Sequence, residues 1–158
     1  MAYPTPSGHQ FLEVISVDFV GPYPRSIRGN RFLLTVFEHT TGWLEAYPSP
    51  NADVNAFVKG FIEFISRFGC PQRILSDLGR HFINSAFSHI ATRLGMPHLK
   101  TSSGNSRGLA VHERRHYPIT TALMAYLLEH SSKNKHKGNW DLAVPGALFA
   151  IRSLRPAD

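Results

Sequence analysis

Hydrophobic positions in the first third of the chain predict three β-strands. Residues 11–20 and 31–38 are rich in β-branched and aromatic side chains, and a Gly-Asn pair between the two runs favours a turn. Residues 43–47 form a third apolar run after the polar stretch HTTG. The three runs predict an antiparallel meander. Its first strand is expected to end near Asp18, because the Gly-Pro-Tyr-Pro that follows cannot continue a strand ladder.

The spacing of apolar residues becomes helical after the meander. Between Asp53 and Phe68 they recur every three or four positions, and Gly69 ends the run. Residues 73–76 then form a short apolar segment. This segment predicts a buried strand that delivers Asp77 at its C-terminal end.

The middle of the chain predicts one more helix and one more strand. Asn84 is a candidate N-cap for a helix that ends at Leu94, where a glycine follows. Residues 97–101 are expected to form a fifth strand. The Gly- and Ser-rich residues 102–108 are expected to form a mobile loop.

Two further helices are predicted in the last third. Apolar residues share one helical face between Ile119 and Leu127, and a basic, polar linker follows. Residues 140–152 predict a final helix, with Asp141 as its cap and Pro145 tolerated near its first turn. The order of elements predicts an α/β fold with a mixed five-stranded sheet flanked by helices.

Length and composition indicate one domain. A chain of 158 residues, 42% of them hydrophobic, is long enough to build a single core. Residues 1–10 contain two prolines and no apolar period, so we expect a flexible arm followed by a domain over residues 11–158. The single residues Trp43, Trp140 and Cys70 are expected to pack in the core.

The net charge and the cysteine content indicate which kind of partner and which cellular compartment to expect. The net charge of +6 indicates an acidic partner, and nucleic acid is favoured over a surface that is basic only for solubility. One cysteine cannot form an intrachain disulfide, which predicts a reducing, intracellular location. No apolar run reaches about 18 residues, so we expect no membrane span.

Three carboxylates are the candidate chemical site. Asp18 and Asp77 follow predicted strands, and Glu113 lies after the predicted loop, with 35 residues between it and Asp77. Carboxylates from separate elements can converge on hard divalent cations such as Mg²⁺, which prefer oxygen ligands. Three arbitrary acids would more often be ordinary surface residues, so the surrounding sequence has to decide.

That surrounding sequence resembles a known family. The segments ISVDFVGPYPRS, GNRFLLTVFEHTTGWLEAYP, ISRFGCPQRILSDLGRHF, RLGMPHLKTS and WDLAVPGALFAIRS are similar, in order and spacing, to the catalytic core of retroviral and Ty3/gypsy-type retrotransposon integrases. The likeness runs from about Phe11 to near the end of the chain. It implies a ribonuclease-H-like fold in which Asp18, Asp77 and Glu113 bind two Mg²⁺ or Mn²⁺ ions.

The resemblance also implies an activity and partners. The reactions would be 3′-end processing of DNA and strand transfer, carried out by a homodimer without a small-molecule cofactor. Within the cell, the nucleus is the expected compartment, with the cytoplasm as the alternative. Family proteins carry further domains on both sides of this core, so the chain is expected to be a core taken from something longer.

Several positions depart from the family pattern. Leu78 stands where an asparagine commonly follows the second aspartate, and Arg80-His81 replace a small polar pair. The loop over residues 102–110 lacks the family's usual segment, and Pro118 interrupts the helix expected after Glu113. These changes favour an alternative, a host-domesticated core that has lost catalysis and acts as an interaction module for nucleic acid or protein.

Basic residues near the predicted site are candidate DNA contacts. Lys100, Arg107, Arg114 and Arg115 are close to the acids in the sequence, and lysine and arginine bind phosphates without reading bases. A solvated charged rim is the competing interpretation.

A zinc motif overlaps the third acid. His112, Glu113 and His116 spell H-E-x-x-H, which in metalloproteases places two histidines on zinc and uses the glutamate as base. Two arginines inside the motif, a proline shortly after it and the lack of a clear third ligand make the zinc protease a remote alternative.

Overall fold

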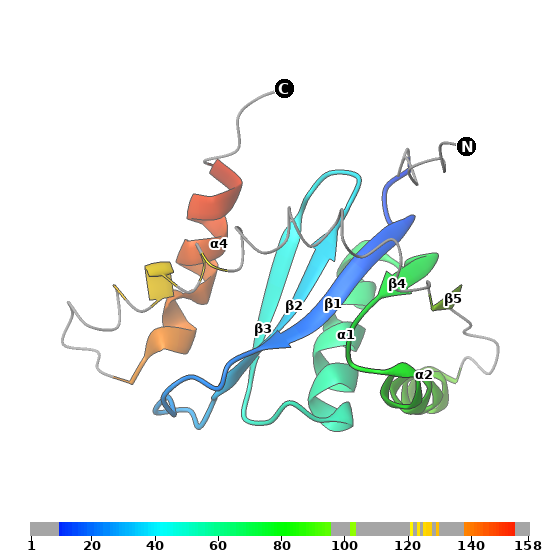
Figure 1. The fold of residues 1–158 in the computed structure, drawn as a ribbon, viewed down its shortest axis with the longest axis horizontal. Helices are drawn as coiled ribbons and strands as arrows, with labels where there is room; N and C mark the ends of the chain where they lie inside the picture. Colours follow the sequence, from blue (N-terminus) through cyan, green and yellow to red (C-terminus); the bar gives the residue numbers. More distant parts are fainter. Residues whose placement is uncertain are drawn as a thin grey trace.

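The computed structural model describes residues 10–95, 102–103, 121, 123, 125–127, 129 and 138–153. Within them, a sheet of five strands has the order β3-β2-β1-β4-β5 (Figure 1). The strands are β1 (Val14–Val20), β2 (Phe32–Glu38), β3 (Leu44–Ser49), β4 (Arg73–Leu75) and the two-residue β5 (Ser102–Ser103). The predicted arm over residues 1–10 lies almost entirely outside the described residues and stays a prediction.

The predicted meander is confirmed. β1 pairs antiparallel with β2, and β2 pairs antiparallel with β3. β4 pairs parallel with the other side of β1, which makes the sheet mixed. β1 runs two residues past Asp18 to Val20, because Asp18 still pairs with Thr35 of β2.

Helix α1 (Val54–Phe68) matches the predicted helix. Asp53 caps its first turn, with a carboxylate oxygen that accepts from the backbone N–H of Ala56 at 2.8 Å. At the other end, Gly69 has φ 98° and donates its N–H to the carbonyl of Ile65. Glycine tolerates this conformation, so the helix ends where the sequence predicted.

Helix α2 (Arg80–Leu94) ends as predicted but begins four residues before Asn84. The prediction that Asn84 caps the helix is therefore wrong. Gly79 has φ 87°, which lets the chain turn sharply after Asp77, and its carbonyl already accepts from the N–H of Ile83.

The fifth strand lies at Ser102–Ser103, inside the stretch predicted to be a loop, and it pairs parallel with β4. A strand pairs through its backbone, so the polar side chains do not prevent this. The predicted strand over residues 97–101 lies outside the described residues.

The last helix is divided into a 3₁₀ turn, η2 (Trp140–Ala143), and α4 (Val144–Ser153). Pro145 lies in the first turn of α4, as predicted. Asp141 does not cap the helix. It is buried, and its carboxylate accepts hydrogen bonds from Ser26 and Asn30 in the loop between β1 and β2.

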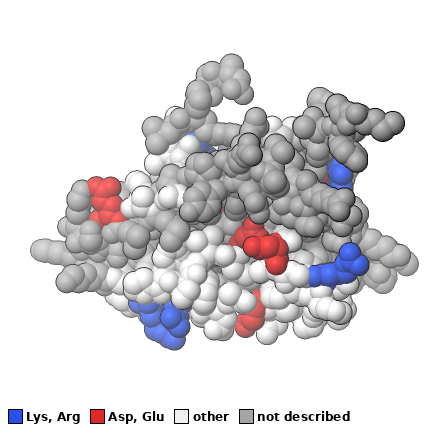
Figure 2. Space-filling model, viewed as in Figure 1, with Lys and Arg blue, Asp and Glu red and all other residues white. Residues whose placement is uncertain are grey.

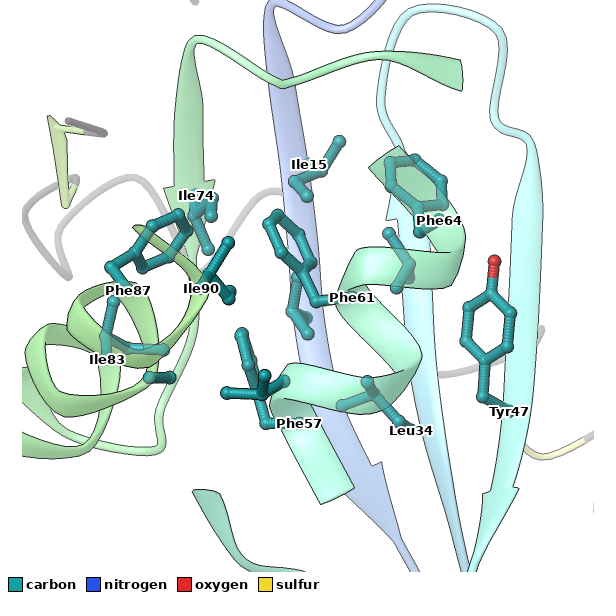
Figure 3. Packing of buried hydrophobic residues seen from close by; sticks show 14 of the residues in the cluster. Ile15, Leu34, Tyr47, Phe57, Phe61, Phe64, Ile74, Ile83, Phe87 and Ile90 are labelled. Atoms are coloured by element: carbon teal, nitrogen blue, oxygen red, sulfur yellow. The ribbon is translucent and has the colours of Figure 1, made fainter. Parts of the chain in front are cut away.

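The core has two parts, one on each face of the sheet. On one face, α1 and α2 pack their aromatic and aliphatic residues against β1, β2 and β4, as Figure 3 shows for Phe57, Phe61 and Phe87. Each fully buried side chain of this size contributes about 1.5–3 kcal/mol. On the other face, β2 and β3 pack against Trp140, Val144 and Leu148 and against the buried helical residues Leu123 and Leu127. The layers are helices, sheet and helices, as Figure 1 also shows.

Trp140 is buried, as predicted, whereas Trp43 is 37% exposed and Cys70 is exposed. The prediction that these last two pack in the core is wrong. Trp43 follows the turn between β2 and β3, where its ring lies against Phe68 and under the Arg152 guanidinium. No helix among the described residues is long and apolar enough to span a membrane.

Candidate metal centre

Two of the three predicted acids lie together at one edge of the sheet. β1 and β4 are parallel neighbours, and Ser16 of β1 is in register with Leu75 of β4. Asp18 and Asp77 each follow these paired positions by two residues. The Asp77 carboxyl adjoins that of Asp18 as a result, and the two groups interact directly.

Two hydrogen bonds from residues distant in the sequence position Asp18. Ser76 Oγ donates to Asp18 Oδ1 at 3.4 Å and accepts from the Leu78 N–H at 3.2 Å. On the opposite side, Thr35 Oγ1 donates to the backbone carbonyl of Asp18 at 3.1 Å. Ser76 therefore connects the two acid-bearing segments, a role that the sequence analysis missed.

The electrostatics of the pair favour a bound cation. Burial raises the pKa of Asp18 to about 8, and the adjacent Asp77 carboxyl adds to this increase. Hydrogen bonds from the backbone N–H of Asp77 and from the Ser76 side chain lower this pKa in part. A divalent cation held by the two carboxylates would offset their repulsion and favour the ionised form of both.

The oxygen donors present fit a hard divalent ion. Within the described ranges, neither Asp18 nor Asp77 forms an ion pair with a basic side chain. Two carboxylates provide some of the ligands that Mg²⁺ or Mn²⁺ takes, the others being water and phosphate oxygens. The part of the chain that the structure describes holds no cluster of three or more His, Cys, Asp or Glu residues that could bind a metal. Glu113 lies outside it.

Apolar contacts fix the turn that follows Asp77. Leu78 is half-buried and packs against the core on the α1 and α2 face. Phe82, in the first turn of α2, contacts the rings of Phe19 and Phe57 with centroids 6.3 and 5.7 Å apart. Asp77 itself is exposed at the start of this turn. The core thus holds the backbone of the acid while leaving its carboxylate accessible.

The remaining predicted site residues lie outside the described residues. They are Lys100, Arg107, His112, Glu113, Arg114, Arg115, His116 and Pro118. Their positions and roles stay predictions. Two further basic residues, Arg25 and Arg28, lie in the loop after β1 and were not among the predicted site residues.

Comparisons by sequence find similarity to part of several Pol polyproteins. It is 26% identical over 148 residues to the retrovirus-related Pol polyprotein from transposon 412 of Drosophila melanogaster, covering 93% of this chain and 11% of that protein. It is 30% identical over 138 residues to the Gag-Pol polyprotein of feline leukemia virus, covering 87% of this chain and 8% of that protein. The chain thus spans about a tenth of the length of these relatives. No family model matches it.

Comparison by structure identifies the fold. The integrase catalytic core domain of HTLV-2, solved in complex with magnesium in a dimeric form, superposes with a TM-score of 0.63 at 21% identity. The match covers 94% of this chain and 91% of that one. The chain is therefore related to retroviral and retrotransposon Pol polyproteins, and it has the ribonuclease-H-like fold of an integrase catalytic core.

Proposed function

We propose that this domain is the core of a divalent-metal-dependent DNA transferase that performs 3′-end processing and strand transfer. The observation that carries the proposal is the junction of Asp18 and Asp77 at the ends of two parallel strands. These two carboxylates would hold Mg²⁺ or Mn²⁺, two ions in the active state, and Glu113 would be the third ligand. The magnesium in the HTLV-2 core supports the choice of ion.

Each part of the site has a role in this reaction. The bound ions would activate the attacking oxygen and stabilise the leaving oxygen of an in-line phosphoryl displacement. Asp18 and Asp77 would bind and orient the ions. Ser76 fixes the Asp18 carboxylate, and the Leu78 contact with the core holds the turn that carries Asp77.

A nicking and strand-transfer assay tests the proposal. Duplex DNA with a free 3′ end is incubated with the protein and Mn²⁺ or Mg²⁺, beside the variants Asp77→Asn and Glu63→Gln. Glu63 is an exposed acid on α1 that pairs with Arg67, so its replacement removes one acidic charge and leaves both aspartates unchanged. We expect product from the wild type and from the Glu63 variant, and a loss of about 10³-fold or more with Asp77→Asn.

One observation favours a second candidate function. Next to Asp77, the apolar Leu78 is half-buried and Arg80 is exposed, where the family pattern has small polar residues. A domesticated core that binds nucleic acid or protein without catalysis would tolerate this change. DNA binding without any product that depends on Asp77 would support this interaction module and exclude the transferase.

The partners follow from the proposed reaction. DNA is the proposed substrate, which implies a nuclear location, and the integrase-type fold favours Glu113 as a Mg²⁺ ligand over its use in a zinc protease. A homodimer is also proposed. In its support, Leu142 and Phe149 near and on α4 are 49% and 73% exposed and offer apolar surface for self-association. Light scattering that reports a monomer at high protein concentration would refute the dimer.

A further inference from the structure

The loop between β1 and β2, residues 21–31, leaves the sheet at the edge that carries the two acids. It begins one residue after Val20, at the C-terminal end of β1 where Asp18 lies. Because β4 runs parallel to β1, Asp77 emerges at the same edge. The loop and the carboxylate pair therefore lie at the same edge of the sheet.

The loop carries positive charge without a matching negative charge of its own. Arg25, Arg28 and Arg31 are its charged residues, and it contains no acid. Arg25 and Arg28 are exposed, and no described residue forms an ion pair or hydrogen bond with either side chain. Figure 2 shows one patch of Lys and Arg colour at the lower left, where Figure 1 places this loop, and further patches on the right side of the molecule.

A buried carboxylate holds the loop from beneath. Asp141 is 5% exposed, and its Oδ2 accepts from Ser26 Oγ at 2.8 Å and from Asn30 Nδ2 at 2.7 Å. Ser26 Oγ also accepts from the N–H of Asn30 at 2.9 Å. A buried carboxylate is costly unless hydrogen bonds compensate it, so this network fixes one conformation of the loop.

The segment before α4 adds a second set of contacts. Trp140 Nε1 donates to the carbonyl of Pro24 at 2.7 Å, and the N–H of Ile27 donates to the carbonyl of Gly138 at 2.8 Å. The rings of Tyr23 and Trp140 lie with centroids 4.8 Å apart. Ser26 is buried, whereas its neighbours Arg25 and Ile27 are exposed. The loop is therefore held by a buried residue while its arginines face solvent.

We propose that this anchored loop is a nucleic-acid contact in which Arg25 and Arg28 bind backbone phosphates of the DNA that the carboxylate pair acts on. The inference rests on the proposed function for its substrate. Arginine suits phosphate because its guanidinium offers paired donors. A rigid loop loses little conformational entropy on binding. The shared edge favours DNA over an acidic protein as the partner.

The salt dependence of DNA binding tests the proposal. Fluorescence anisotropy measures the affinity for a labelled 20-base-pair duplex over a range of salt concentrations, with EDTA present so that no divalent ion takes part. Each phosphate contact contributes about 0.9 to the slope of log K against log salt. The variant Arg25→Gln/Arg28→Gln is expected to lower that slope by about 1.8 and to bind roughly tenfold or more weakly at 0.1 M salt.

Two matched variants control for charge and chemistry. Arg67→Gln/Arg93→Gln removes the same charge from exposed residues near the C-terminal ends of α1 and α2, and we expect no change of slope. Arg25→Lys/Arg28→Lys keeps the charge and is expected to recover most of the slope. Circular dichroism checks that every variant is folded.

If both glutamine double variants lower the salt slope equally, DNA binding depends on total charge and not on the loop, which would overturn the proposal. An unchanged slope in the Arg25/Arg28 variant would overturn it as well, and so would a wild-type protein without measurable DNA affinity. A different result would refute the proposed catalytic function alone. Suppose that Asp77→Asn leaves nicking unchanged while Arg25→Gln/Arg28→Gln still lowers the salt slope in EDTA. This result would support the loop contact and refute the metal-dependent reaction.

Discussion

Glu38 shows how a single residue stabilises this fold from within. It is 1% exposed at the end of β2, yet its two carboxylate oxygens accept from the backbone N–H groups of Leu12, Thr40 and Thr41. Burial alone would raise its pKa, but the hydrogen bonds from Thr41, Thr40 and Leu12 outweigh burial and lower it. The ionised form of Glu38 therefore ties the start of β1 to the turn after β2.

The lowered pKa of Glu38 predicts a pH-dependent effect of its replacement. A pKa that is lower in the folded state contributes stability above the unfolded value of 4.5, and this contribution is lost as pH falls through the folded pKa. Glu38→Gln should cost about 1–3 kcal/mol in urea unfolding at pH 7, and its effect should shrink at pH 3. The exposed Glu63→Gln serves as control. A cost that is equal at both pH values would contradict this account.

The sequence predicted some residues well because their signals are local. The apolar runs predicted Asp18 near the end of one strand and Asp77 directly after another. β1 continues past Asp18 to Val20, but the two acids still meet because β1 and β4 are parallel neighbours. The partner of Asp141 could not be predicted, because Ser26 and Asn30 are more than 100 residues away and no local pattern marks the contact. Its position near a helix start made a cap the reasonable but incorrect expectation.

Among the elements, α2 shows where local capping signals mislead. Asn84 is a common N-cap type, but the helix is already formed at Arg80, since Gly79 supplies the turn and Phe82 and Ile83 bury against the core. A general preference for asparagine as a cap loses to the packing of an earlier turn. The start of α2 matters functionally, because it sets where Asp77 lies.

Gly79 is predicted to be essential to that start. It has φ 87°, and a Cβ added there would meet no heavy atom within 4 Å, so the cost of alanine comes from the backbone conformation alone. Gly79→Ala should lower the free energy of unfolding by about 1–2 kcal/mol. Gly146→Ala, inside α4, should instead be neutral or stabilising by up to about 1 kcal/mol.

Urea unfolding of both variants measures the difference between the two glycines. Equal effects would mean that the left-handed conformation of Gly79 does not determine where α2 begins. Metal-free buffer keeps this measurement independent of any ion bound at Asp77.

For the whole molecule, the alternation of strands and helices was enough to predict an α/β layered domain, and the structure confirms a mixed sheet between helical layers. The two-residue β5 was not predicted, because two serines carry no hydrophobic signal. It is a strand because its backbone pairs with β4. The fixed conformation of the loop over residues 21–31 could not be predicted either, because no local pattern marks it. Its order comes from η2, at the other end of the chain.

At the scale of the whole molecule, we propose that the fold brings Asp18 and Asp77 together as a divalent-metal site. Electron paramagnetic resonance of Mn²⁺ titrated into the protein counts free and bound ion directly. Asp18→Asn and Asp77→Asn each remove one ligand, whereas Glu63→Gln removes an exposed charge on α1 and keeps the pair intact.

We expect the wild type and the Glu63 variant to bind Mn²⁺ with the same affinity. Each aspartate variant should bind at least about tenfold more weakly, since it loses a charged oxygen ligand. Mn²⁺ affinity that is unchanged in both Asp18→Asn and Asp77→Asn would contradict the claim that these carboxylates form the metal centre.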